Sequence, residues 1–178
     1  MRCADVLPLA VALSLAACAV SVPNPAPSPN PVAATAPAPV SDGAYTKMES
    51  RIFTLVNAER KRRGLRALVW NERLDRAAKL HARNMATYRK MTHVIPESRL
   101  PTLTHRAQHV AYPYAMIAEN IALGYTDAES VVRGWMESPG HRRNILNPEV
   151  SEIGTGVVIS GRGGLYFCQV FGRRLSSI

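Results

Sequence analysis

The sequence has few cysteines and few aromatic residues. Its three cysteines, Cys3, Cys18 and Cys168, form no Cys-x-x-Cys pair, which excludes a disulfide-stapled mini-protein and a thiolate zinc site. Phe, Trp and Tyr make up only 6% of the 178 residues, yet 47% of the chain is hydrophobic. That content is enough for a core and too high for a chain that is disordered throughout. The length fits one domain with appendages.

Acidic residues are outnumbered, and charge is almost missing from the first part of the chain. Lys and Arg number 22 against 13 Asp and Glu, so the formal net charge is +9. Residues 1–41 contain only Arg2 and Asp5, which cancel, and the whole excess therefore belongs to residues 42–178. Most basic residues there are Arg, which favours bidentate pairing with carboxylate or phosphate groups.

Residues 1–17 predict an export signal. The apolar run from Val6 to Ala17 is too short for a bilayer-spanning helix, which needs roughly 17–25 residues, and is typical of the hydrophobic part of a signal peptide. It ends in Leu15-Ala16-Ala17-Cys18, which resembles the bacterial lipobox, so we expect Cys18 to be acylated and to anchor the chain in a membrane. An ordinary secretory signal that is cut nearby is the alternative.

Residues 18–41 are rich in proline and alanine and carry no charge. This composition cannot build a core and favours extended polyproline II geometry. We therefore expect a semi-rigid stalk or a disordered linker, followed by one domain over residues 42–178. These features predict an exported protein in the periplasm or at the cell surface, anchored through Cys18 or else secreted.

In the domain, hydrophobic spacing predicts helices first and strands late. One helix runs from Tyr45 to a basic cluster at Arg60–Arg63, which we interpret as offsetting the helix dipole rather than as a nucleic-acid patch. A second helix begins after Asn71, a plausible cap, and turns His81 toward the core, where a lone histidine is usually structural. No regular structure is readable over residues 89–116, and a long connection of this kind often lines a binding surface.

The second half of the domain predicts two further helices, a short strand and a hairpin. A strand is expected near residues 119–122. Residues 126–129 have the form of a capping box with Thr126 as the cap, and Ser138-Pro139 begins another helix with His141 in its first turn. Residues 153–159 and 165–171 flank a Gly-rich turn and predict a hairpin that buries Cys168. The order predicts an α+β fold with helices packed on an antiparallel sheet.

Short segments in this domain also occur in a characteristic order: Asn57-Ala58-Glu59-Arg60, His93, Glu119-Asn120-Ile121-Ala122, Trp135-Met136, Ser138-Pro139-Gly140-His141-Arg142, Asn144-Ile145-Leu146, Glu152-Ile153-Gly154 and Phe171-Gly172. The ordered set resembles the bacterial branch of the CAP superfamily, which takes in cysteine-rich secretory proteins, antigen five and pathogenesis-related proteins and is also called the SCP domain. The resemblance implies an α-β-α sandwich, with an antiparallel sheet between helical layers.

The resemblance also implies a cavity in which His and Glu side chains meet, and which holds a divalent metal in some members. His93 corresponds to the first cavity histidine, Glu119 to the Glu of the Glu-Asn-Ile motif and His141 to the histidine of the Ser-Pro-Gly-His motif. The animal-type Gly-His-Phe-Thr segment that supplies a second histidine is absent. Glu137 and His81 are the weaker candidates for completing the set.

Two kinds of function fit these residues. His93, Glu119 and His141 have the types required for a three-ligand zinc site, or for a Glu that activates water beside a neutral imidazole. However, their spacing is not specific, and the sequence has no G-x-S-x-G elbow, P-loop or G-x-G-x-x-G turn. We assign no catalytic residue, and we favour a non-catalytic module that binds an anionic lipid, a cell-wall glycan or a protein of the envelope.

The alternatives are a metal-dependent hydrolase, using His93, Glu119 and His141, and a purely structural envelope protein. In the structural interpretation, the same residues form a hydrogen-bonded network that fixes the long connection against the helices. No nucleic-acid partner is expected for an exported protein.

Overall fold

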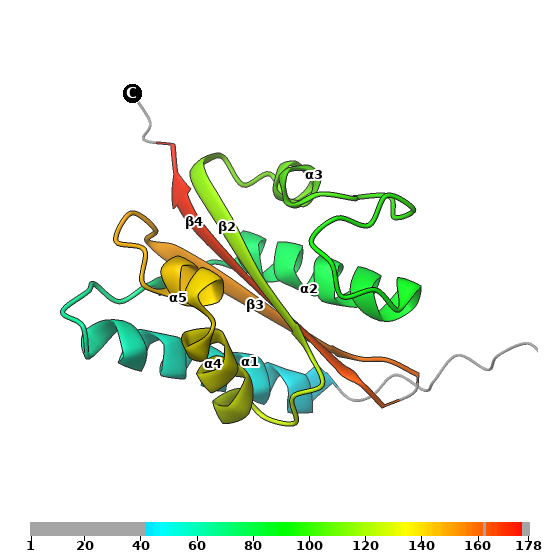
Figure 1. The fold of residues 1–178 in the computed structure, drawn as a ribbon. Coiled ribbons are helices and arrows are strands. Elements are labelled where there is room, and N and C mark those ends of the chain that lie inside the picture. Colours follow the sequence, from blue (N-terminus) through cyan, green and yellow to red (C-terminus); the bar gives the residue numbers. More distant parts are fainter. Residues whose placement is uncertain (1–41, 162, 176–178) are drawn as a thin grey trace, which may run out of the picture. The chain divides into compact units, whose positions relative to one another are not determined.

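Helices and strands alternate along the part of the chain that the structure, a computed structural model, describes: residues 42–161 and 163–175 (Figure 1). The elements are α1 (Asp42–Lys61), β1 (Val69–Trp70), α2 (Glu72–Tyr88), α3 (Leu103–His109), β2 (Tyr114–Leu123), α4 (Ala128–Glu137), α5 (Pro139–Ile145), β3 (Glu152–Ile159) and β4 (Leu165–Arg174). The expected signal peptide, linker and acylated Cys18 lie outside the described residues. Within those residues, none of the helices is both long enough and apolar enough to cross a bilayer.

The strands form one sheet in the order β1-β3-β4-β2. The expected hairpin is confirmed, since β3 and β4 pair antiparallel, and β2 pairs antiparallel with the other side of β4. The two-residue β1 pairs parallel with β3, through Val69 opposite Glu152 and Trp70 opposite Ile153. The sheet is therefore antiparallel with one short parallel addition, and β2 is an edge strand.

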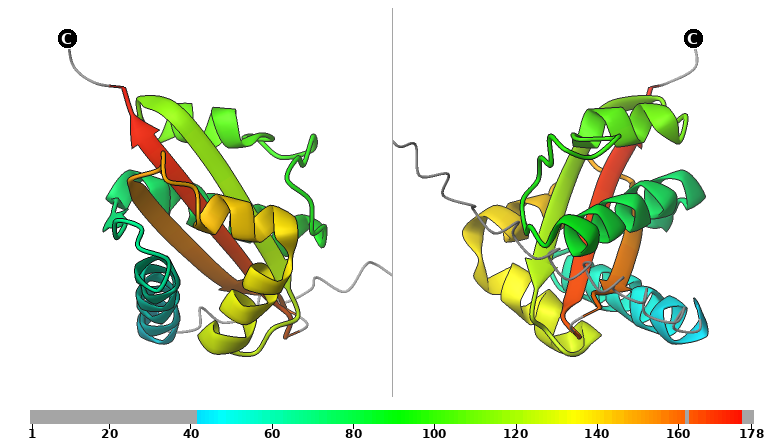
Figure 2. Two further views of the ribbon diagram at one scale, coloured as in Figure 1. Left: turned by 60° about the vertical axis from the view of Figure 1, so that its left-hand side comes forward. Right: turned by 90° about the vertical axis from the view of Figure 1, so that its right-hand side faces the viewer.

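Helices cover both faces of the sheet, as the α-β-α expectation requires (Figure 2). One core cluster joins α1, α4 and α5 to one face and includes Ile52, Trp135 and Phe171. The other joins α2 to the opposite face and includes Leu74 and Val170. Since residues 48–171 supply both clusters, the segment 42–178 contains a complete core, and we expect it to fold by itself.

The helix α2 lies directly on strand β3, and two glycines make this approach possible. A Cβ atom added at Gly154 would lie 1.9 Å from the backbone nitrogen of Asp75, and one at Gly156 would lie 2.5 Å from that of Lys79. No side chain fits in this space. The N-terminus of α2 is fixed as the sequence predicted, because the Asn71 side chain accepts hydrogen bonds from the amides of Arg73 and Leu74.

Several local expectations were wrong. Residues 89–116 contain α3 and the beginning of β2; the strand expected near residues 119–122 is confirmed as part of β2, which is longer and begins at Tyr114. The helix α3 has only seven residues, too few to show a helical period. The cap of α4 is Asp127, not Thr126, and its side chain accepts from the Ser130 amide. Ser138 precedes α5 as expected but makes no capping hydrogen bond with its side chain.

The basic cluster at the end of α1 divides into a buried and an exposed part. Arg60 is buried, and its guanidinium donates to the carbonyl oxygens of Arg66, Ile145 and Asn147. Arg62 and Arg63 are exposed and pair with Glu59. Beyond any effect on the dipole of α1, Arg60 therefore joins this helix to the end of α5, a role that its sequence context did not indicate.

Candidate functional site

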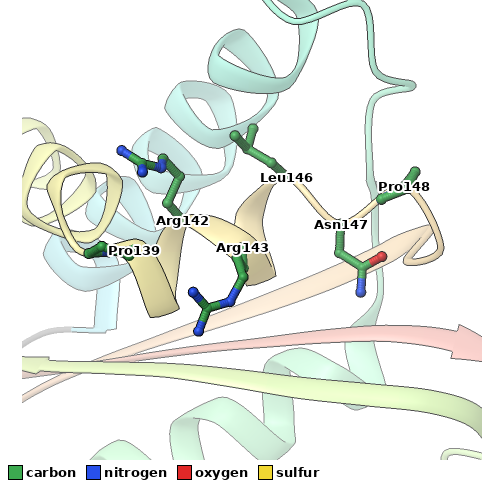
Figure 3. Close-up of a pocket in the computed structure, with 6 residues that line it drawn as sticks. All are labelled: Pro139, Arg142, Arg143, Leu146, Asn147 and Pro148. Atoms are coloured by element: carbon green, nitrogen blue, oxygen red, sulfur yellow. The ribbon is translucent and has the colours of Figure 1, made fainter.

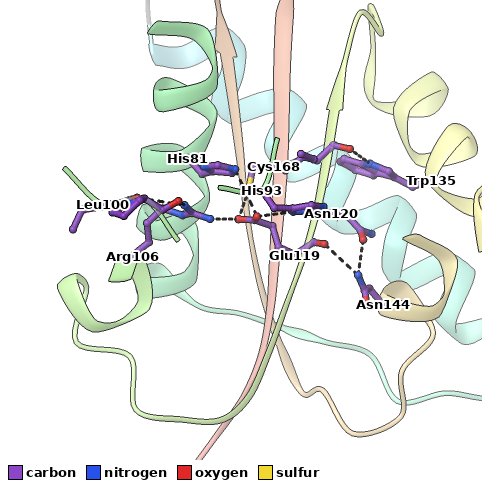
Figure 4. A network of polar contacts seen from close by, with 11 residues as sticks. His81, His93, Leu100, Arg106, Glu119, Asn120, Trp135, Asn144 and Cys168 are labelled. Carbon is purple, nitrogen blue, oxygen red and sulfur yellow. Dashed lines mark hydrogen bonds and ion pairs between the residues drawn. The ribbon is translucent and has the colours of Figure 1, made fainter. Parts of the chain in front are cut away.

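Glu119, in the middle of β2, is the centre of a buried polar cluster (Figure 4). Its side chain is only 4% exposed. Its Oε1 lies 2.9 Å from Nδ1 of His93 and 3.6 Å from Nε2 of His81. Its Oε2 accepts a hydrogen bond of 2.7 Å from Nη2 of Arg106 and lies 3.5 Å from Sγ of Cys168. Both carboxylate oxygens are therefore already engaged by groups of the chain.

Neighbouring residues of β2 point to opposite faces of the sheet, which divides the expected site residues into two groups. Glu119 meets His81 of α2 and Arg106 of α3 on one face. Asn120 points to the other face, where its Nδ2 donates to the carbonyl oxygen of His141 at the start of α5. The structure thus brings together Glu119, His93 and His81, and among the described residues no hydrogen bond or ion pair joins the His141 side chain to Glu119.

Glu119 stays ionised despite its burial. Burial would raise the pKa of this carboxyl, but the hydrogen bond with His93 and the nearby Arg106 and His81 together lower it below the usual value. Arg106 is itself fully buried, so the ion pair is shielded from water. A carboxylate held in this way is a poor proton acceptor, because its lowered pKa makes the charged form the stable one.

Two further groups of the cluster, His81 and Cys168, stay neutral near pH 7. Burial lowers the pKa of His81 to about 4, and the charge of Arg106 acts in the same direction against the attraction of Glu119. Burial and then the charge of Glu119 raise the pKa of the Cys168 thiol well above its usual value. Cys168 is thus the buried thiol that the sequence predicted, and it is too far from thiolate character to act as a nucleophile.

Arg106 is the residue of this cluster that the sequence analysis missed. Besides its pair with Glu119, its Nη1 lies 3.4 Å from the carbonyl oxygens of Leu100 and Pro101. It therefore ties the long connection between α2 and α3 to the sheet, while His93 ties the other half of that connection to the same carboxylate. No sequence signal marked Arg106, because an arginine in a seven-residue helix is far more often exposed than buried.

In the described structure, neither His141 nor Glu137 forms a hydrogen bond or an ion pair with the Glu119 side chain. Burial, and then the charge of His93, lower the pKa of His141, so the two histidines are near enough to interact electrostatically. The start of α5 is held to the edge of β2 by Asn144, whose Nδ2 donates to the Glu119 carbonyl oxygen and to Asn120 Oδ1. Glu137 is exposed at the end of α4 and lines a separate surface hollow with Leu55 of α1.

The resemblance also predicts a three-ligand metal site at this cluster. Within residues 42–161 and 163–175, no group of three or more His, Cys, Asp and Glu side chains is placed to hold a metal ion. The guanidinium of Arg106, 2.7 Å from Glu119 Oε2, would also repel a divalent cation at that carboxylate. Zinc stays a prediction of the resemblance: metal analysis of the domain, purified without chelator, would detect it and show whether His93→Ala/His141→Ala removes it.

A second candidate surface is a hollow of about 460 Å³ on the outside of α5. It is lined by Pro139, Arg142, Arg143, Leu146, Asn147 and Pro148 (Figure 3). Its only charged side chains are arginines, and its apolar wall comes from prolines and Leu146. The buried Arg60 fixes the end of α5 through the carbonyl oxygens of Ile145 and Asn147, so the hollow is built on a rigid element.

Comparison with known proteins places this fold and these motifs in a known group. A sequence model of the cysteine-rich secretory protein family (CAP) matches residues 53–171. The chain is 39% identical over 113 residues to the uncharacterized Bacillus subtilis protein YkwD, covering 64% of this chain and 43% of that protein. It is 31% identical over 122 residues to the uncharacterized membrane protein YlbC of the same organism, covering 66% and 35%. The chain thus spans less than half the length of these relatives.

Solved structures show the same architecture. An extracellular protein containing an SCP domain from Bacillus anthracis superposes with a TM-score of 0.69 and 28% identity, over 77% of this chain and 45% of that one. An outer surface protein from Borrelia burgdorferi superposes with a TM-score of 0.67 and 22% identity, over 72% and 94%. The second likeness is one of fold alone.

Proposed function

Because the chain belongs to the cysteine-rich secretory protein (CAP) family, we propose that it is a non-catalytic extracytoplasmic module that is tethered through Cys18 and binds an anionic ligand of the envelope. The B. anthracis structure is that of an extracellular protein, which supports an extracytoplasmic site of action. The export signal and lipobox-like segment at residues 1–18 support the tether.

The non-catalytic part of the proposal is supported by the state of the Glu119 cluster. Arg106 and His93 occupy the carboxylate, and the fully buried His81 has a pKa of about 4. A general base needs a free carboxylate or imidazole with a pKa near the working pH and access to substrate. Glu119 and His81 are not such groups, and the cluster instead fixes the connection between α2 and α3 in place.

The single observation that supports an anionic ligand is a set of arginines that are exposed on the surface and form no ion pair. Most carboxylates of the described residues are already paired with Lys or Arg, including Glu49, Glu59, Glu97, Glu129 and Glu152. Within the same residues, a larger set of exposed arginines forms no ion pair: Arg66, Arg73, Arg76, Arg83, Arg89, Arg99, Arg133, Arg142 and Arg143. This surface attracts phosphate or carboxylate groups.

We place the strongest ligand contact at the hollow on α5, where Arg142 and Arg143 stand beside an apolar wall. The test measures binding of the domain 42–178 to vesicles of neutral phosphatidylcholine, to vesicles that also contain anionic phosphatidylglycerol, and to isolated cell-wall sacculi. We expect binding to an anionic surface that weakens strongly as NaCl rises from 50 to 500 mM, the range over which the Debye length falls from about 14 to about 4 Å.

Arg142→Gln/Arg143→Gln should weaken this binding several-fold more than Arg62→Gln/Arg63→Gln. The second variant is the matched control, because it removes the same charge from arginines that are paired with Glu59. Equal effects of the two variants would assign binding to net charge and overturn the role of the hollow. Binding to neither anionic vesicles nor sacculi would overturn the proposed function.

A further inference from the structure

The connection between α2 and α3 exposes large hydrophobic side chains. Of the large hydrophobic residues exposed in the described structure, three lie close together in the sequence: Tyr88 at 37%, Met91 at 52% and Val94 at 46%. The others, Val69, Leu123 and Leu175, are scattered singly over strand ends and edges. Single exposed hydrophobic residues are normal, whereas a group of them marks an interaction surface. We call Tyr88, Met91 and Val94 the 88–94 patch.

Basic residues flank this patch in the sequence. Arg89, Lys90 and Arg99 are exposed in the same connection. Glu97, which is the one acidic residue between Arg89 and Thr102, forms an ion pair with Lys90. The surroundings of the patch are therefore net positive. Apolar side chains beside Arg and Lys are the combination that binds the interface of an anionic bilayer, where the charges meet headgroup phosphates.

The backbone beneath the patch is held in place, so these side chains do not turn inward. Ile95 is completely buried, and its amide donates to the carbonyl oxygen of Pro101. The Tyr88 hydroxyl donates to the Glu97 carbonyl oxygen. His93, between Met91 and Val94, contacts the Glu119 carboxylate. The chain leaves α2 and runs around the outside of the domain before it reaches α3 (Figure 1).

We propose that the 88–94 patch is a membrane-contact loop, in which Met91 and Val94 enter the interface of an anionic bilayer while Arg89 and Arg99 contact lipid phosphates. The argument for the anionic lipid rests on the proposed function, but the loop is distinct from the hollow on α5. In this proposal, the contacts of Glu119 with His93 and Arg106 hold the loop in the conformation that binds the membrane. An apolar contribution also predicts that part of the vesicle binding survives high salt, because salt screens charges and does not weaken hydrophobic burial.

The test compares Met91→Ser/Val94→Ser with Val69→Ser/Leu123→Ser in the domain 42–178. The control variant removes two hydrophobic side chains of similar exposure from other elements, Val69 at 64% and Leu123 at 40%. In phosphatidylcholine/phosphatidylglycerol vesicles at 500 mM NaCl, we expect the patch variant to lose about tenfold or more in partition coefficient. The control should stay within about twofold of the wild type, and thermal unfolding should show that both variants are folded.

A second readout reports the position of the loop directly. An environment-sensitive dye on Met91→Cys should shift to shorter wavelength when anionic vesicles are added, and the same dye on Val69→Cys should not. Cys168 is buried with a strongly raised thiol pKa and should not be labelled in the folded domain. Equal loss of binding in the two serine variants, or no spectral shift at position 91 in a domain that binds vesicles, would overturn the proposal.

The failure of this proposal can be distinguished from the failure of the proposed function. Salt-sensitive vesicle binding without a shift at position 91 leaves the anionic ligand in place and removes only the loop. Binding to sacculi but not to anionic vesicles also overturns the membrane-contact loop, because the ligand is then a cell-wall component. Loss of binding by the patch variant together with a blue shift at position 91 supports the loop and the anionic lipid together.

Discussion

Replacing Arg106 with methionine should destabilise the domain more than any loss of a surface charge. Methionine approximates the apolar part of the side chain but removes the guanidinium. Glu119, whose side chain is 4% exposed, then keeps its negative charge without the cation that lies 2.7 Å from Oε2. The perturbation therefore leaves a charge buried and only partly compensated by His93.

The expected cost follows from the burial of both partners. Removing one member of a buried ion pair costs about 3–5 kcal/mol of unfolding free energy. For a domain of this size, that corresponds to a fall in melting temperature of roughly 10–20 °C. The matched control is Arg51→Met, because the Arg51–Glu129 pair has the same kind of contact at 2.7 Å but side chains that are 52% and 50% exposed. That exposed pair is worth about 0–1 kcal/mol.

The pH dependence identifies the charge of Glu119 as the cause. In the wild type, the pKa of Glu119 is lower when folded than its ordinary value of 4.5, so its stabilising effect is present above that pH and is lost as pH falls through the folded value. Without Arg106, burial dominates and the pKa rises above the ordinary value. The variant then prefers protonated Glu119, and its stability deficit should shrink as pH falls from 7 to 4.

Urea unfolding of the domain 42–178 at pH 7, 5.5 and 4 measures these differences. Adding Glu119→Gln to Arg106→Met should recover part of the loss at pH 7, since it removes the uncompensated charge. A deficit for Arg106→Met no larger than that of Arg51→Met would refute the reasoning, as would a deficit that is independent of pH.

Three other predictions concern His81, Gly154 and Cys18. The pKa of His81 is lowered from 6.5 to about 4 in the folded domain, so between these pH values the unfolded chain binds a proton that the folded domain does not. The domain should therefore lose up to about 3 kcal/mol of unfolding free energy as pH falls from 6.5 to 4. Urea unfolding should show a smaller loss in His81→Asn. Gly154→Ala should lower stability by roughly 3 kcal/mol by forcing α2 away from β3, while Gly140→Ala, whose Cβ would have 3.8 Å to the nearest atom, should be nearly neutral in thermal unfolding. Palmitate labelling in a bacterial host should disappear in Cys18→Ser, and unchanged labelling would exclude acylation there.

The sequence determined the features that depend on neighbouring residues. The apolar spacing of α1 and α2, the Asn71 cap and the alternating strands around a Gly-rich turn are local patterns, and each gave the correct element. The family resemblance predicted how the helices and the sheet are layered. It could do so because its motifs are spread over nearly the whole domain, from about residue 50 to residue 172. It also identified Glu119 and His93 as residues that meet.

Only the tertiary structure decided what surrounds Glu119. Strand pairing sets which face of the sheet Glu119 points to, and it places the side chain of Asn120 toward α5, where it donates to the His141 carbonyl oxygen. Arg106 comes from a helix too short to show a period, and its burial depends on a carboxylate 13 residues away. Pairing of the two-residue β1 with β3 likewise joins residues more than 80 positions apart. Such contacts are fixed by packing of distant segments, so local sequence patterns determine the elements while the chemistry of the cluster is set by the fold.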